Sequence, residues 1–298
     1  MICCLACPCC PEGGRLALHA STKGFWSTNF RMLTSEVPVY QVESGQVIAD
    51  QERSHEVRWK FVDDCTVGVT VDNTSPDYSS LQATLDRIQA WTSENTKTAV
   101  MHINTATTSV QAPAVTAGAH PLQLVQSAKL LGVIIEHKLD WKAHVNNTIK
   151  AASYRLYMLR RLRSLGAPMP ELRTIYTSFI LPKLTYASPA WSYSLNSTQQ
   201  PQLEKVQKRA CRIMLGADYN NALSTLEMPS LSDLYHHALA GFGCGLLHHP
   251  RHRQLLPPAF PRPPRAVRHF NKIQPIRARS VRYKNSTIPP IVKIINSS

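Results

Sequence analysis

Two adjacent carboxylates separate two runs of β-forming residues in the stretch K-F-V-D-D-C-T at 60–66. Residues 57–62 alternate in the way of a half-buried strand, and 65–71 are rich in β-branched side chains. Asp is a poor strand former, so Asp63 and Asp64 predict a tight turn that joins the two runs into a β-hairpin. Neighbouring carboxylates repel each other, and the usual reason for such a pair is a bound cation. An exposed hairpin tip without a ligand also fits this local sequence.

Short elements are predicted between this hairpin and residue 140. Ser75-Pro-Asp is typical of a helix start, and apolar residues at helical spacing then continue to Trp91. Residues 99–103 predict a short strand, and 130–135 predict another β-rich run.

Helical spacing dominates the rest of the chain up to residue 247. A long amphipathic helix is marked by Val145, Ile149, Ala152, Leu156, Leu159 and Leu162. Further helices are predicted to begin at Pro170, near Gln202 and at Ser230. The expected fold class is therefore α+β, with a small β-hairpin region followed by a mainly α-helical region.

Charge is distributed very unevenly along the chain. Residues 1–140 carry 10 Lys and Arg against 14 Asp and Glu, whereas 141–298 carry 23 against 5, a net charge of +18. Such an excess favours a polyanionic partner, with nucleic acid ahead of an anionic membrane. No apolar run approaches the roughly 20 residues that span a bilayer, so we expect a soluble protein that does not enter membranes. Cys65, Cys211 and Cys244 are scattered singly, which suits a reducing compartment and predicts an intracellular protein, cytoplasmic or nuclear. The sequence does not indicate an oligomeric state.

The two ends of the chain differ from its middle. Five of the eight cysteines lie in M-I-C-C-L-A-C-P-C-C at 1–10, but no second Cys/His pair completes a zinc site. Residues 1–56 are therefore predicted to be a weakly structured, disordered leader. Residues 250–298 hold nine prolines, 11 Lys and Arg and no acidic residue, which predicts an extended basic tail without a conventional core. Residues 57–140 and 141–249 are the two intervening domains that we expect.

The motifs form an ordered series. F-V-D-D at 61–64 is followed by L-Q-A-T-L-D-R-I-Q-A-W at 81–91, S-A-K-L-L-G-V-I-I-E-H-K-L-D-W-K-A-H-V at 127–145 and A-A-S-Y-R-L-Y-M-L-R-R-L at 151–162. Then come Y-T-S-F-I-L-P-K-L-T-Y-A-S-P-A-W at 176–191, L-E-K-V-Q-K-R-A-C-R-I-M at 203–214 and R-Y-K-N-S-T-I-P at 282–289. The series resembles the C-terminal half of a reverse transcriptase, the RNA-directed DNA polymerase, of non-LTR (LINE-type, jockey-like) retrotransposons. The 57–140 part then corresponds to the end of the palm, and 141–249 to a thumb-like domain.

The resemblance implies roles for individual residues. Asp63 and Asp64 would hold catalytic Mg²⁺, with Asp63 the more direct ligand. Phe61 and Val62 would pack beneath the nascent base pair, and Lys97 would match the lysine of a palm strand. The implied partners are an RNA template and an RNA–DNA or DNA duplex. Phosphate contacts are expected from Lys150, Arg155, Arg160, Arg161, Arg163, Lys205, Lys208, Arg209 and Arg212. A solvated helix face explains each of these residues equally well when it is taken alone.

The sequence also departs from the family. Residues 1–56 contain no counterpart of the upstream aspartate strand or of the Q-G-x-x-L-G-P-type segment of the palm, and E-N-T-K-T at 94–98 follows Trp91 sooner than the family pattern has it. We therefore expect the chain, as written, to be an inactive fragment that does not extend a primer.

Two other functions remain open. The chain could be a non-enzymatic nucleic-acid-binding remnant, which needs only 141–298. It also has a segment similar to the N-terminal region of an AlkB-homologue protein; oxygenase activity is not expected, because no His-x-Asp or His-x-Glu occurs in the sequence. Cys244, His248, His249 and His252 have spacings that could bind zinc, but an ordinary solvated cluster is favoured.

Overall fold

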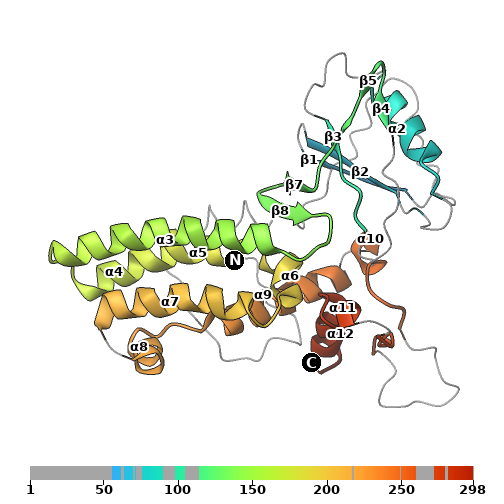
Figure 1. The fold of residues 1–298 in the computed structure, drawn as a ribbon. Coiled ribbons are helices and arrows are strands. Elements are labelled where there is room, and N and C mark those ends of the chain that lie inside the picture. Colours follow the sequence, from blue (N-terminus) through green and yellow to red (C-terminus); the bar gives the residue numbers. More distant parts are fainter. Residues whose placement is uncertain are drawn as a thin grey trace, which may run out of the picture. The chain divides into compact units, whose positions relative to one another are not determined.

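The computed structural model describes residues 56–61, 64–69, 71, 76–89, 98–104, 114–216, 218–248, 250–259, 272–278 and 281–297 (Figure 1). These residues fall into two compact units, one up to Leu139 and one from Asp140 onward. The first contains small two-stranded sheets and a helix, and the second is mainly helical. The α+β fold class is therefore confirmed. The predictions for 1–55, with the leader, lie outside the described residues.

The predicted hairpin is present in the first unit. Strand β1 (Glu56–Phe61) pairs antiparallel with β2 (Asp64–Val69), and Phe61 lies opposite Asp64. Asp64 is therefore the first residue of the second strand, and not part of the turn as the sequence suggested. A two-residue connection is the commonest in hairpins, and it leaves Asp64 within the ladder in spite of its low strand propensity.

A side chain on a helix of the same unit forms hydrogen bonds with the backbone of a strand. Helix α2 (Ser79–Gln89) carries Gln82, whose Nε2 donates a 2.9 Å hydrogen bond to the carbonyl oxygen of Thr116, while its Oε1 accepts a 3.0 Å bond from the Thr116 backbone nitrogen. The side-chain amide thus bonds to the backbone as a neighbouring strand would. Thr116 belongs to β4 (Thr116–Ala117), which pairs antiparallel with β5 (His120–Pro121).

Four further strands complete the sheets of this unit. Strands β3 (Ala99–Val100) and β6 (Gln123–Leu124) are parallel, and β7 (Ser127–Leu130) and β8 (Val133–Glu136) are antiparallel.

The β-rich run predicted at 130–135 is thus interrupted by a turn. Leu131 and Gly132 connect the two strands and have φ angles of 45° and 87°. Two successive positive φ angles are what a type I′ hairpin turn requires. The apolar side chains on both sides of Gly132 conceal this turn in the sequence.

The second unit begins with the bundle of helices that the sequence predicted (Figure 1). Its elements are α3 (Lys142–Ser164), α4 (Met169–Ile175), the π-helix η2 (Tyr176–Ile180), α5 (Leu181–Thr185), α6 (Ser188–Trp191), the 3-10 helix η3 (Ser192–Ser194), α7 (Gln199–Leu215), α8 (Tyr219–Thr225) and α9 (Leu231–His248). Its core is formed by fully buried side chains, among them Leu156, Leu159, Leu172, Tyr176, Ile180, Leu184, Trp191, Leu203 and Met214. The helical region expected from 141 onward is confirmed.

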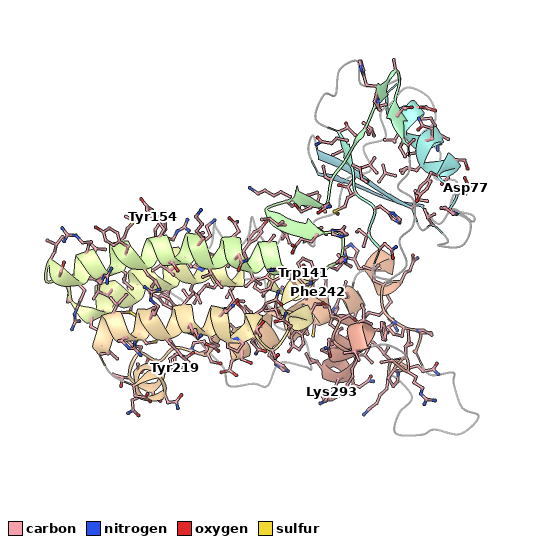
Figure 2. All side chains as sticks on the ribbon, viewed as in Figure 1. Asp77, Trp141, Tyr154, Tyr219, Phe242 and Lys293 are labelled. Atoms are coloured by element: carbon pink, nitrogen blue, oxygen red, sulfur yellow. The ribbon has the colours of Figure 1, made fainter. Side chains whose placement is uncertain are left out.

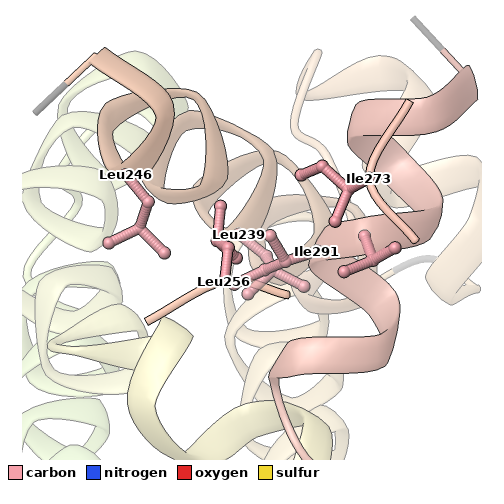
Figure 3. Close-up of a cluster of buried hydrophobic side chains, with 6 residues drawn as sticks. Leu239, Leu246, Leu256, Ile273 and Ile291 are labelled. Carbon is pink, nitrogen blue, oxygen red and sulfur yellow. The ribbon is translucent and has the colours of Figure 1, made fainter. Parts of the chain in front are cut away.

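The prediction of a tail without a core was wrong for part of 250–298. Short helices α10 (Pro250–Arg253) and α11 (Val281–Lys284) precede α12 (Ile288–Ser297), which packs on α9. A core cluster joins the two regions, as Figure 3 shows, and consists of Leu239, Leu246, Leu256, Ile273, Ile291 and Val292.

Local sequence explains this helix. Pro289 and Pro290 occupy the first turn of α12, where a missing N–H is tolerated, and apolar residues then recur at helical spacing. The overall proline count of the segment concealed that local pattern. Within the part of the chain that the structure describes, no helix is long and apolar enough to cross a membrane.

Candidate nucleic-acid interface

Helices α3 and α7 lie next to each other and run in the same direction, with a hydrogen bond joining them near each end (Figure 1). Near their N-termini, Nε2 of Gln199 donates a 2.7 Å hydrogen bond to the carbonyl oxygen of Asp140. At their C-termini, the Arg163 guanidinium donates a 2.7 Å bond to the carbonyl oxygen of Met214. The two helices are therefore adjacent and parallel, and each presents a solvent-facing side of its own.

The two faces of α3 differ sharply. Its buried side consists of His144, Val145, Thr148, Ala152, Leu156 and Leu159. Exposed residues at helical spacing line the opposite side, and we call them the α3 stripe: Lys150, Tyr154, Tyr157, Met158, Arg161 and Leu165. No Asp or Glu occurs anywhere in the 23 residues of this helix. The stripe is thus basic and aromatic, with no acidic side chain on the helix to neutralise it.

Helix α7 presents a second basic row. Lys205, Arg209 and Arg212 are exposed and lie at i, i+4 and i+7, so they share one face. The single acidic residue of this helix is Glu204, which accepts a 2.8 Å hydrogen bond from the Tyr219 hydroxyl on α8. Burial, together with this hydrogen bond, raises the pKa of Tyr219 far above its ordinary value, so its hydroxyl keeps its proton. The Glu204 carboxylate is therefore directed to α8.

The side chains of three of the nine predicted phosphate-contacting residues contact other groups of the helical unit. Arg155 donates a 3.2 Å hydrogen bond to the carbonyl oxygen of Ala151 and lies 4.6 Å from the Phe179 ring centre. Arg163 caps the end of α7, as described above. The Lys208 ammonium lies 5.0 Å from the Tyr219 ring centre, which turns it toward α8. Lys208 is therefore not counted with the row of Lys205, Arg209 and Arg212.

The other six predicted residues are all exposed, and we call them the basic surface: Lys150, Arg160, Arg161, Lys205, Arg209 and Arg212. Arg160 lies 6.0 Å from the ring centre of Tyr157, its neighbour on α3. The side chains of the other five form no hydrogen bond or ion pair with any residue that the structure describes. Their charges are therefore available to an anionic ligand.

Sequence reasoning missed the exposed aromatic residues of α3. Tyr154 and Tyr157 lie opposite the apolar side of the helix, and Figure 2 shows Tyr154 on the outward side of α3. The signal was present in the sequence, because both tyrosines fall on the polar face of the amphipathic pattern. They have no role in burying the core.

The residues predicted for the polymerase site are described only in part. Val62, Asp63 and Lys97 lie outside the described residues, and for Phe61 and Asp64 the structure gives the backbone pairing alone. Among described residues no group of three or more His, Cys, Asp or Glu side chains could hold a metal ion. Mg²⁺ binding by Asp63 and Asp64 stays a prediction.

The structure explains why Cys244 and His248, whose spacing could bind zinc, lie close together. Cys244 is buried, and Nδ1 of His248 lies 2.7 Å from the Cys244 backbone oxygen, a contact between successive turns of α9. His249 lies outside the described residues.

No protein-family model, no curated protein and no solved structure matches this chain.

Proposed function

We propose that residues 57–297 are the end of the palm, the thumb and the tail of a reverse transcriptase of the non-LTR retrotransposon type, and that the basic surface binds the RNA–DNA duplex of template and primer. The ordered motif series supports the origin of the chain. The exposed cations on α3 and α7, two adjacent and parallel helices, are the observation that supports duplex binding.

The geometry suits a phosphate backbone. The Lys and Arg side chains of the basic surface are long and flexible and come from two adjacent helices, so they can contact several phosphates of an RNA–DNA hybrid. The only acidic residue on either helix is held by Tyr219. Binding should therefore be driven by the release of counterions and should not depend strongly on sequence.

The test measures the affinity of the purified chain for a fluorescent RNA–DNA hybrid at salt concentrations between about 50 and 200 mM. A variant carrying Lys205→Gln, Arg209→Gln and Arg212→Gln should bind more weakly, and its logarithmic salt slope should be smaller by about one for each lost phosphate contact. Because all three side chains are exposed, the variant should keep its thermal stability.

A matched control carries Lys183→Gln, Lys284→Gln and Lys293→Gln, which remove three exposed charges from α5, α11 and α12. This control should keep the wild-type salt slope. Equal losses in the two variants, or wild-type affinity that does not change with salt, would refute duplex binding by the basic surface.

The binding role and a catalytic role are separable. Duplex binding uses only the helical unit, so Asp63→Asn and Asp64→Asn should leave the affinity for the hybrid unchanged. We expect no incorporation of nucleotides at the primer end in the presence of Mg²⁺. Incorporation that is abolished by Asp63→Asn would establish the chain as a polymerase and would reject the non-enzymatic alternative.

A further inference from the structure

The α3 stripe exposes two aromatic rings between cationic side chains. Tyr154 is 72% exposed and Tyr157 is 54% exposed. Lys150 lies one turn before Tyr154 on the same face, and Arg161 lies one turn after Tyr157. Each ring is therefore within one helical turn of a positive charge.

The two rings have little contact with the rest of the described chain. No ring or cation contact is recorded between Tyr154 and another described residue. The Tyr157 ring has one such contact among the described residues, with the Arg160 guanidinium at 6.0 Å, the outer limit of a cation–π contact. The ring faces are thus open to a planar ligand.

We infer that Tyr154 and Tyr157 form a stacking platform for unpaired bases, so that the α3 stripe binds a single strand of RNA. The inference rests on the proposed function, in which the template strand continues as single-stranded RNA beyond the duplex. Aromatic side chains next to Lys and Arg are the means by which proteins hold single strands without reading their sequence. Phosphates would contact Lys150 and Arg161 while bases stack on the rings.

Charge and geometry favour an unpaired strand over other ligands. An acidic protein could bind the cations, but ion pairs with its carboxylates would not use the flat faces of the two exposed rings. A duplex offers no free base face along its length, because its bases are already stacked on one another. The side chains at i and i+3 have Cβ atoms about 5–6 Å apart, so successive unstacked bases can reach both rings.

The test compares four ligands: single-stranded RNA, the same strand with its bases removed, the RNA–DNA hybrid and an acidic polypeptide. The wild-type chain should bind the intact single strand roughly tenfold more tightly than the abasic strand for each ring engaged. A variant with Tyr154→Leu and Tyr157→Leu should lose this preference and keep its affinity for the hybrid. A matched variant with Tyr154→Phe and Tyr157→Phe retains both rings and should retain the preference.

The outcomes separate this inference from the proposed function. If the Leu variant still prefers the intact strand, or if the Phe variant loses that preference, the stacking platform is wrong even where hybrid binding stands. Tighter binding of the acidic polypeptide than of the RNA strand would identify the stripe as a protein-docking surface and would also overturn the inference. Weaker hybrid binding by the Lys205, Arg209 and Arg212 variant would support the proposed function and has no bearing on the stacking platform.

Discussion

The Arg163 guanidinium at the end of α3 donates a 2.7 Å hydrogen bond to the backbone carbonyl oxygen of Met214 at the end of α7. The last carbonyl groups of a helix lack partners within the helix and lie at the negative end of its dipole. Arg163 therefore joins two parallel helices by neutralising one of these carbonyl groups. Arg161, two residues earlier, is exposed, and its guanidinium bonds to no described residue.

These two arginines should separate stability from binding. We expect Arg163→Met to lower the free energy of unfolding by about 1 kcal/mol, because the Met214 carbonyl loses a charged donor. Arg161→Met should change stability by less than about 0.5 kcal/mol but weaken nucleic-acid binding. Denaturant unfolding and hybrid titration of both variants provide the measurement. If one variant lost more than the other in both stability and hybrid affinity, the separate roles of Arg163 and Arg161 would be contradicted.

Helices α9 and α12 approach each other closely at Gly243. A Cβ atom placed on Gly243 would lie 3.0 Å from Cγ2 of Ile291, which is fully buried and cannot move freely. Gly243→Ala should therefore destabilise the chain by about 1 kcal/mol or more, despite the higher helix propensity of Ala.

Gly245 provides a matched control in the same helix. A Cβ atom on Gly245 meets nothing within 4 Å, so Gly245→Ala should stabilise the chain by about 0.5–1 kcal/mol. Thermal or denaturant unfolding distinguishes the two. The packing of α12 on α9 would be in doubt if both substitutions stabilised the chain equally.

His144 should make stability depend on pH. Its ring is buried between Trp191, at 5.1 Å, and Trp141, at 6.4 Å, and burial lowers the pKa of His144 below its ordinary value of 6.5. The folded chain thus favours the neutral ring, and the unfolded chain binds more protons in acid. The free energy of unfolding should be highest above pH 6.5 and fall as the pH drops through that value.

The substitution His144→Phe removes the titrating group and keeps an aromatic ring of similar size. Unfolding curves between about pH 7.5 and pH 5 should show a larger loss of stability in the wild type than in this variant. Other histidines affect both proteins equally, so the difference between the curves belongs to His144. Parallel curves would show that burial of this ring has no influence on stability in acid.

The sequence by itself determined the elements whose signals are local. Alternation before Asp63 and β-branched residues after Asp64 predicted the hairpin, and apolar spacing from Val145 to Leu159 predicted α3 together with its buried side. These predictions succeeded because the period of side chains along a strand or helix is a property of the backbone itself.

Only the tertiary structure decided which charged groups are available to a ligand and which segments contribute to the core. Arg155, Arg163 and Lys208 resemble the six residues of the basic surface in sequence, yet each contacts a group on another turn or another helix. Ile291 likewise enters the core only because α12 packs on α9. Such contacts join residues far apart in the chain, and no local period records which of them will meet in the folded protein.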